Sequence, residues 1–306
     1  MRKAYAIILV VFIIAALASI GFLKEARERE VKIGYHVVSL KHPYAERLAE
    51  EFEDEAVKRG FVPLIVSGKN DRLQEQKNID FLIEQKVDAI FITALDGDFI
   101  VSAVKRANEA GIPVFAIDRK INGGKLTSTI TSDNEDIGEQ AAHYIVDRLT
   151  RRFGKPAGNV AEVKGLPDVS ATIERSQGFH KVLSRYPGIN ISAEVYGDYD
   201  PIVSRNAALK IIEEQTEIDA IFAHNDDILK GVYSAFEEMK PGYRTIMVGV
   251  DGNPDILKLI KTTGKVDATL VQQANKIMTA ALNAFEDHRN GKEVPEQLNI
   301  KASLYK

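Results

Sequence analysis

The chain has 306 residues, of which 45% are hydrophobic and 27% charged, and it carries a formal net charge of -4. This composition is that of a soluble globular protein large enough for two cores, and the weak acidity gives no reason to expect a nucleic-acid partner. The absence of cysteine excludes disulfides, thiolate metal sites, a thiol nucleophile and a lipid-modified N-terminal cysteine.

The first 30 residues predict export. Arg2 and Lys3 precede an uncharged, mostly apolar run of 20 residues at 4–23, and a charged spacer follows at 24–30. This order is typical of a signal peptide, and 16–18 offers a small-residue cleavage site; the same run is also long enough to span a bilayer as a retained anchor. Both alternatives stay open, and both place the folded part in the periplasm or on the outer face of the cytoplasmic membrane.

Ten short apolar runs, rich in Val and Ile, predict the strands of an α/β protein. They lie at 31–39, 61–67, 89–94, 113–118, 126–131, 159–164, 191–196, 220–223, 245–250 and 268–272. Little polar alternation within the runs is typical of strands that are buried on both faces of a parallel sheet. The segments between them have helical spacing, so repeated β-α-β units predict doubly wound parallel sheets.

A weak internal repeat indicates two equivalent lobes. The sequence DAIF occurs at 88–91 and again at 219–222, and each copy is followed by a predicted strand that ends in an aspartate. These aspartates are Asp118, 30 residues after the first copy begins, and Asp251, 32 residues after the second begins. The matching order and spacing favour a duplication in which each half forms one open α/β lobe.

Open α/β sheets bind ligands outside the carboxyl ends of their strands, so two facing lobes predict one cleft between them. Polar residues at the predicted strand ends are His42, Tyr44, Thr93, Asp118, Arg119, Tyr199, Asn225, Asp251 and Gln272. Carboxylates, amides and a guanidinium form paired bonds with sugar hydroxyls, and aromatic rings pack on the apolar faces of a sugar. Structural roles stay open for some of them: Asn225 as a helix cap, Asp118 with Arg119 as a surface ion pair, and the tyrosines as surface residues.

The residues predict no catalysis and no cofactor. The chain contains no glycine-rich phosphate loop, no nucleophile elbow and no zinc-protease motif. The six histidines include no pair four residues apart, so no metal site is expected. A binding protein is therefore favoured over an enzyme.

Seven motifs carry a resemblance to a known family. They are LKHPY at 40–44, IPVFAIDR at 112–119, TSDN at 131–134, ERSQGF at 174–179, FAHNDD at 222–227, VGVDG at 248–252 and ATLVQ at 268–272. From residue 31 onward, about nine-tenths of the chain, the sequence resembles the periplasmic sugar-binding proteins of the ribose-binding type. The resemblance implies sugar contacts at Tyr44, Asp118, Arg119, Ser132, Tyr199, Asn225, Asp251 and Gln272.

The resemblance also implies the periplasmic binding protein type 1 fold, in which two doubly wound lobes are joined by a three-strand hinge and close over the ligand. The three crossings are expected near Ser132, Gln272 and Asn299. After the segment 1–30, the N-terminal lobe is then expected to comprise 31–132 and 273–298, and the C-terminal lobe 133–272 and 299–306.

Four positions depart from the ribose-binding pattern. His42 and Thr93 stand where asparagines are expected, Ala45 stands in place of a stacking Phe, and Ile173 is assigned to the position of an arginine that bonds the sugar. A lost charge-assisted bond costs about 1.5–3 kcal/mol. Together with similarity to the galactofuranose-binding branch, these departures favour a hexose or a furanose over ribose.

The predicted function is capture of a monosaccharide and its delivery, by a monomeric protein, to the membrane permease of an ABC-type importer. The alternative is a sensor component that presents its loaded form to a membrane kinase or chemoreceptor. A repressor of the lac type would need a helix-turn-helix before residue 31, where the apolar segment stands instead.

Overall fold

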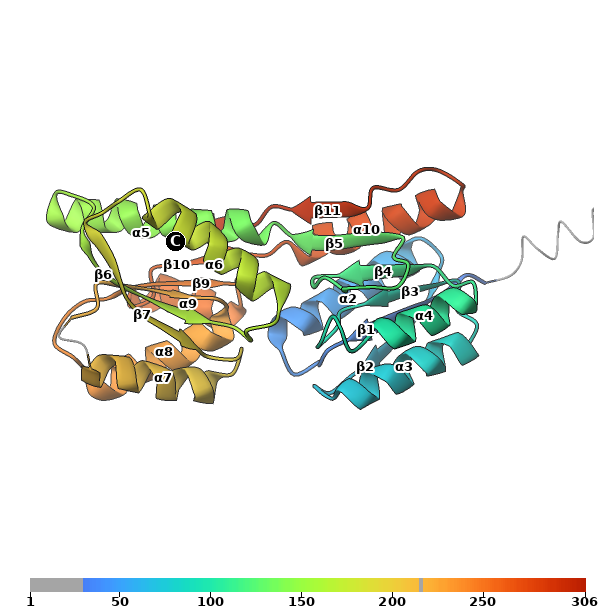
Figure 1. The fold of residues 1–306 in the computed structure, drawn as a ribbon, viewed down its shortest axis with the longest axis horizontal. Coiled ribbons are helices and arrows are strands. Elements are labelled where there is room, and N and C mark those ends of the chain that lie inside the picture. The colour runs from blue at the N-terminus through green and yellow to red at the C-terminus, as the bar shows by residue number, and fades with distance from the viewer. Residues whose placement is uncertain (1–29, 215–216) are drawn as a thin grey trace, which may run out of the picture.

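The structure is a computed structural model that describes residues 30–214 and 217–306. These residues form two lobes, each built on a six-stranded sheet with helices on both faces (Figure 1). The first sheet contains β1 (Lys32–Val37), β2 (Val62–Ser67), β3 (Ala89–Ile92), β4 (Val114–Ile117), β5 (Ser128–Ser132) and β11 (Gln297–Ile300). Its helices are α2 (Pro43–Lys58), α3 (Arg72–Glu84), α4 (Val101–Glu109) and α10 (Ala274–Arg289).

The second lobe repeats this plan. Its sheet contains β6 (Gly158–Lys164), β7 (Ile189–Tyr196), β8 (Ala220–Ala223), β9 (Ile246–Val250), β10 (Ala268–Val271) and β12 (Ser303–Tyr305). Its helices are α5 (Asn134–Phe153), α6 (Ser170–Leu183), α7 (Pro201–Glu214), α8 (Asp226–Met239) and α9 (Pro254–Thr263).

The strand orders of the two sheets correspond. They are β11-β5-β4-β3-β1-β2 in the first lobe and β12-β10-β9-β8-β6-β7 in the second. The repeated sequence leads into β3 at 88–91 and into β8 at 219–222, and these two strands occupy the same place in their sheets. The predicted fold class, two doubly wound α/β lobes, is confirmed, and each of the ten predicted strands coincides with one of β1 to β10.

Two short strands, β11 and β12, were not predicted from the sequence. Both are partly exposed and contain no apolar run of the kind that marks the other strands. β11 pairs in parallel with β5, whereas β12 pairs antiparallel with β10. They are therefore edge strands, which pairing in the folded lobe, rather than local sequence, places in the sheets.

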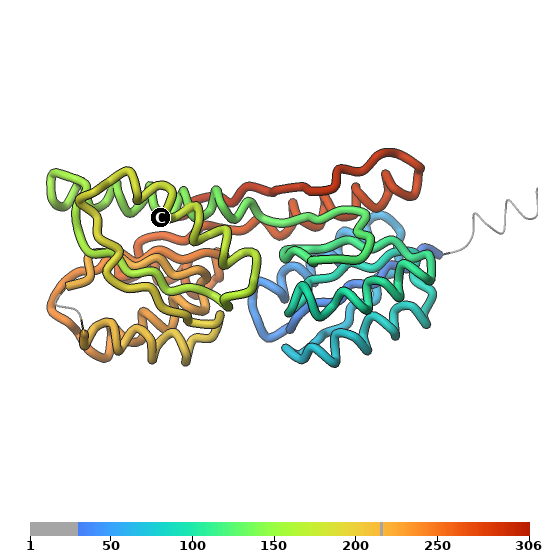
Figure 2. Tube along the Cα trace, viewed as in Figure 1, coloured from blue at the N-terminus to red at the C-terminus, as the bar shows by residue number. Residues whose placement is uncertain are grey.

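The chain passes between the lobes three times along one side of the molecule (Figure 2). The first two passages follow β5 and β10, next to the predicted crossings at Ser132 and Gln272. The third lies between Ile300, the last residue of β11, and Ser303, the first of β12. The predicted limit before Asn299 is therefore wrong, because it falls inside β11, which stays in the first sheet through its pairing with β5. The other residue limits of the two lobes stay a prediction.

Helices α5 and α6 of the second lobe are in direct backbone contact. A Cβ atom at Gly178 of α6 would lie 2.0 Å from the carbonyl oxygen of Glu135, and one at Gly138 of α5 would lie 2.1 Å from that of Arg175. Only glycine permits this approach, which places the N-terminal half of α6 at the edge of the space between the lobes.

Of the predicted export segment at 1–30, residues 1–29 lie outside the described residues. Among residues 30–214 and 217–306, no helix is both long enough and apolar enough to cross a membrane.

Candidate functional site

A cavity of about 590 Å3, open solvent included, lies between the carboxyl ends of the strands of the two lobes. The cavity is lined by Val38, His42, Tyr44, Ala45, Thr93, Asp118, Arg119, Ala171, Arg175, Tyr199, Asn225, Asp227, Asp251 and Gln272. Nine of the ten residues predicted to contact a ligand are among them, and Ser132 is the exception. Their contacts with a ligand stay a prediction.

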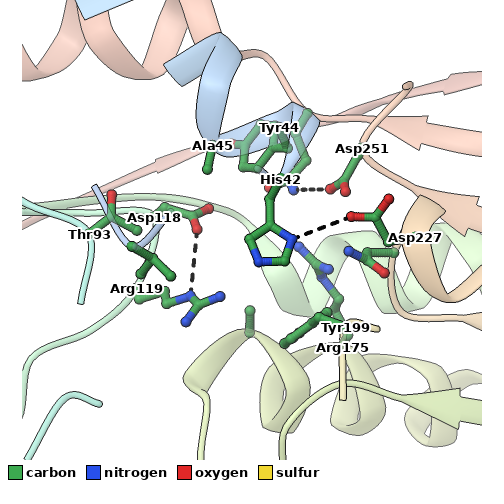
Figure 3. Close-up of a pocket in the computed structure, with 14 residues that line it drawn as sticks. His42, Tyr44, Ala45, Thr93, Asp118, Arg119, Arg175, Tyr199, Asp227 and Asp251 are labelled. Carbon is green, nitrogen blue, oxygen red and sulfur yellow. Dashed lines mark hydrogen bonds and ion pairs between the residues drawn. The ribbon is translucent and has the colours of Figure 1, made fainter. Parts of the chain in front are cut away.

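Two aspartates enter the cavity from opposite lobes (Figure 3). Asp118 directly follows β4 and Asp251 directly follows β9, the equivalent strand of the second sheet. Both have positive φ angles, 66° and 119°, which are uncommon for residues other than glycine and are typical of ligand-binding turns. Each backbone N–H is held by the neighbouring strand, donating to Ile130 O in the first lobe and to Leu270 O in the second, both at 2.9 Å.

The two carboxyl groups are poorly hydrated. Burial raises the pKa of Asp118, although the charges of Arg119 and Arg175 oppose the rise. Burial also raises the pKa of Asp251 to about 6, again against Arg175. A carboxylate that has lost its water gains most from a ligand that donates hydrogen bonds, because those bonds replace the missing hydration.

A guanidinium from each lobe balances these charges. The Arg119 Nε atom lies 3.9 Å from Asp118 Oδ2, and Nη1 donates to Ala94 O at 3.3 Å. In the second lobe, Arg175 on α6 donates from Nε to Asn134 Oδ1 at 3.0 Å and from Nη1 to His224 O. Arg175 is only 3% exposed.

Arg175 corrects the sequence analysis, which assigned the sugar-bonding arginine to position 173 and took Ile173 as its loss. The Ile173 side chain is 46% exposed and does not line the cavity, whereas Arg175 does. Residues two apart on a helix point in nearly opposite directions, so a shift of two positions exchanges the surface for the cavity. Because the cavity has its second guanidinium after all, Ile173 no longer argues against ribose.

Ser132 lies behind the cavity rather than in its wall. Its Oγ atom donates to Gln272 Oε1 at 2.6 Å, and Gln272 Nε2 in turn donates to Asp251 Oδ1 at 2.7 Å. Ser132 is the last residue of β5, and Gln272 directly follows β10. These two hydrogen bonds therefore connect two hinge segments to the cavity carboxylate of Asp251. Ser132 therefore orients Gln272.

Two further residues complete the second lobe's side of the cavity. Asn225 caps α8, since its Oδ1 accepts from Ile228 N at 2.9 Å, and it lines the cavity as well, so its two predicted roles coexist. Asp227, which the sequence analysis missed, lies 3.6 Å from His42 Nδ1 of the first lobe. Burial opposes ionisation of Asp227, but the nearby His42 and the hydrogen bond from Lys230 outweigh it and lower its pKa.

Tyrosine rings from the two lobes supply the apolar surface. Tyr44 is 8% exposed at the start of α2, and burial raises its pKa well above the ordinary value, with a further contribution from the nearby cavity carboxylates. Tyr199 has a φ of 57° and hydrogen-bonds Thr172 Oγ1 through its hydroxyl at 2.7 Å. A Cβ atom at Gly165 would lie 2.0 Å from the Tyr199 ring, so this glycine makes room for the ring. Both positions suit rings that flank a sugar.

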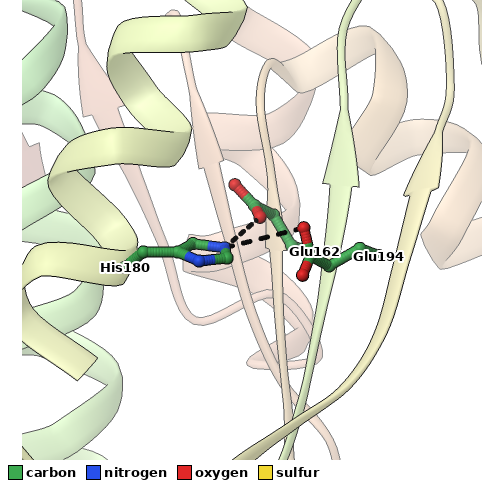
Figure 4. A group of neighbouring side chains, drawn as sticks. All are labelled: Glu162, His180 and Glu194. Carbon is green, nitrogen blue, oxygen red and sulfur yellow. Dashed lines mark hydrogen bonds and ion pairs between the residues drawn. The ribbon is translucent and has the colours of Figure 1, made fainter. Parts of the chain in front are cut away.

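One cluster outside the cavity has the residue types of a metal site. Within the described part of the chain, ligand atoms of Glu162, His180 and Glu194 lie within 4.8 Å of one another (Figure 4). Lys164 Nζ, however, lies 2.6 Å from Glu194 Oε2, and the other oxygen of Glu162 bonds His224 Nε2 at 2.8 Å. Although burial opposes it, hydrogen bonding to the two histidines lowers the pKa of Glu162 to about 2. The carboxylates of the cluster are already engaged by Lys164 and the two histidines, and we assign it a structural role.

Two lobes that enclose a cavity of carboxylates, guanidinium groups and tyrosines define a binding protein for a small polar ligand. Residues 33–293 match the model of the periplasmic binding protein domain, and the chain belongs to this family. It is 35% identical over 277 residues to the ribose import binding protein RbsB of Bacillus subtilis, covering 90% of this chain and 88% of the relative. It is 28% identical over 302 residues to the galactofuranose-binding protein YtfQ of Escherichia coli, covering 96% and 93%. The fructose-binding periplasmic domain of a hybrid two-component system has a TM-score of 0.80 at 26% identity, covering 90% of each chain.

Proposed function

We propose that the chain captures a monosaccharide in the cavity between its lobes and delivers it to a membrane importer of the ABC type. The observation that carries the proposal is that Asp118 of one lobe and Asp251 of the other face one cavity. Sugar hydroxyls donate to carboxylates and accept from guanidinium groups and amides, so one sugar can form hydrogen bonds with the polar groups of both lobes at once. Closure then occurs around the ligand, because only a closed cavity provides both sets of bonds.

Within the monosaccharides, we propose a hexose or a furanose. Ala45 lines the cavity with a methyl group where the ribose-binding pattern has an aromatic ring, and so leaves more space. The hydroxyl of Thr93 is engaged by Tyr35 at 2.8 Å, which leaves a less polar wall than an asparagine at this position. The relatives named for galactofuranose and fructose support this proposal, whereas RbsB of Bacillus subtilis is named for ribose.

A sensor role is the second candidate. It is supported by the similarity to a fructose-binding domain that belongs to a hybrid two-component system. In that role the closed, sugar-loaded form would be presented to a membrane kinase. Crosslinking in membranes that contain the sugar distinguishes the two roles, because the importer role predicts a permease as the crosslinked partner and the sensor role predicts a kinase.

Thermal unfolding with a panel of pentoses, hexoses, furanoses, polyols, amino acids and carboxylic acids tests the ligand class. A ligand at 100 times its Kd adds about 2.7 kcal/mol to the free energy of unfolding. We expect a hexose or a furanose to give the largest increase. Stabilisation by amino acids or carboxylic acids, with none by any sugar, would refute the proposal.

The Ala45→Phe variant tests the size argument. A ring at this position takes up space in the cavity, so hexose affinity should fall more than pentose affinity. Calorimetry with one hexose and one pentose measures the ratio. Equal losses for both sugars would show that Ala45 does not set the size of the ligand.

A further inference from the structure

Arg47 bridges the two lobes beside the cavity without lining it. It lies on α2 of the first lobe, and its Nη1 and Nη2 atoms donate to Gly252 O and Asp251 O of the second lobe, both at 2.8 Å. Its guanidinium carbon lies 5.6 Å from the centre of the Tyr44 ring. One side chain therefore contacts the backbone of one cavity residue and the ring of another.

The backbone that Arg47 holds is strained. Asp251 has a φ of 119° and Gly252 one of 73°, and a Cβ atom at Gly252 would lie 2.8 Å from the Val271 side chain. The N–H groups of this turn are held inside the second lobe, by Leu270 O at 2.9 Å and by the Thr269 hydroxyl at 3.3 Å. Its carbonyl groups are held from the first lobe, by Arg47. The carbonyl groups of the turn that carries the Asp251 carboxylate are therefore hydrogen-bonded to Arg47 only while the two lobes are together.

Other charged contacts also join the lobes around the cavity. His42 faces Asp227 at 3.6 Å, and Lys120 Nζ bonds Glu174 Oε1 at 2.5 Å. Arg47 differs from these because it bonds two backbone carbonyls, whose positions do not depend on side-chain rotamers. The planar guanidinium suits two parallel bonds, and an ammonium group does not.

We propose that Arg47 is a positioning residue that holds the turn of Asp251 and Gly252 against the first lobe, favours the closed arrangement of the lobes, and so raises the affinity for every ligand by the same factor. The inference rests on the proposed sugar-binding function. The apparent Kd equals the intrinsic Kd divided by the fraction of protein in the closed state. A bond made only between the lobes changes that fraction and leaves the contacts to the ligand unchanged. A residue that touches the sugar changes the ranking of sugars instead.

The test uses the full chain with Arg47→Met and Arg47→Lys. We expect Arg47→Met to weaken the binding of two different sugars by the same factor, about 10-fold, through faster dissociation. Arg47→Lys should weaken binding almost as much, although it keeps the charge, because it cannot bond both carbonyls. Calorimetry measures the affinity, and stopped-flow fluorescence measures the dissociation rate. The melting temperature of the sugar-free protein should stay within a few degrees, since Arg47 makes these two bonds to the other lobe.

Arg59, which directly follows the last residue of α2, provides a matched control. Its guanidinium bonds Glu55 at 2.6 Å and Glu286 at 2.7 Å, both within the first lobe. Arg59→Met should therefore leave affinity unchanged. An affinity of Arg47→Met within twofold of the wild type, or different losses for the two sugars, would overturn the inference.

Small-angle scattering of the sugar-free proteins separates this inference from the proposed function. Arg47→Met should shift the sugar-free ensemble toward a larger radius of gyration than that of the wild type and of Arg59→Met. This result is expected even if no sugar in the panel binds, an outcome that would refute the proposed function alone. Superimposable scattering curves for wild type and Arg47→Met would overturn the role of Arg47 in closure.

Discussion

Replacing Asp118 by Asn tests whether the aspartates at the ends of β4 and β9 serve the ligand. The substitution keeps the volume of the side chain, and asparagine, like aspartate, tolerates the φ of 66° at this position. It removes the negative charge and replaces one acceptor oxygen by an amide NH2 group. The Asp118 side chain is 16% exposed and its nearest cation, Arg119, lies 3.9 Å away, so the charge is free to accept hydrogen bonds from a ligand.

The expected loss follows from the difference between charged and neutral acceptors. Hydrogen bonds to charged groups contribute about 1.5–3 kcal/mol and neutral ones about 0.5–1.5 kcal/mol. One affected hydroxyl therefore weakens the Kd about 10-fold and two weaken it about 100-fold. The sugar-free protein should melt at the same or a higher temperature, because burial raises the pKa of Asp118 and its charge therefore opposes folding.

Calorimetry and thermal unfolding measure both quantities on one variant. At a sugar concentration of 100 times the wild-type Kd, stabilisation should fall from about 2.7 to about 1.4 kcal/mol for a 10-fold weaker Kd. Asp198→Asn is the control: Asp198 also has a positive φ, 54°, but is exposed and outside the cavity, so affinity should not change. If Asp118→Asn lowers the melting temperature and leaves affinity within twofold of the wild type, Asp118 is structural and the proposed site fails.

Three further predictions address pH and packing. Since burial raises the pKa of Asp251 to about 6 and hydroxyl donors favour its ionised form, sugar affinity should be constant above about pH 7 and fall as the pH drops through 6. Calorimetry from pH 8 to 5 that shows a constant affinity would contradict this. The pKa of Glu162 is lowered from 4.5 to about 2, so its contribution to stability is present above pH 4.5 and is lost as the pH falls toward 2. Urea unfolding should therefore show a weaker acid dependence in Glu162→Gln over this range, and an unchanged dependence would count against the histidine bonds. Gly178→Ala places a Cβ atom 2.0 Å from Glu135 O and should lower the free energy of unfolding by about 1–3 kcal/mol. A free energy of unfolding equal to that of the wild type would mean that α5 and α6 are not in contact there.

Much of the site followed from sequence because strand ends are recognisable locally. Asp118 and Asp251 end apolar runs in two copies of one repeat, and parallel sheets bring the carboxyl ends of their strands to one edge. Asn225 and Gln272 follow strands in the same way. These residues line one cavity because the fold class alone brings such positions together.

Positions on helices were harder to place. The ribose-binding pattern was aligned with residue 173 rather than Arg175, and the sequence does not show which face of that helix turns toward the other lobe. That face is decided by the contact of α5 and α6 at Gly138 and Gly178, which joins residues about 40 positions apart. Ser132 was placed in the cavity wall for a similar reason, because its hydrogen bond to Gln272 depends on how the two hinge segments lie in space.

The sequence by itself determined the fold class, the duplication and the chemical character of the cavity, because burial periodicity and strand-end residues are local properties. Only the tertiary structure decided which groups meet across the cleft. Arg47 reaches Asp251 and Gly252 from more than 200 positions away, and His42 reaches Asp227 from almost as far. Such contacts depend on the relative placement of two separately formed lobes, which no local pattern in either lobe encodes.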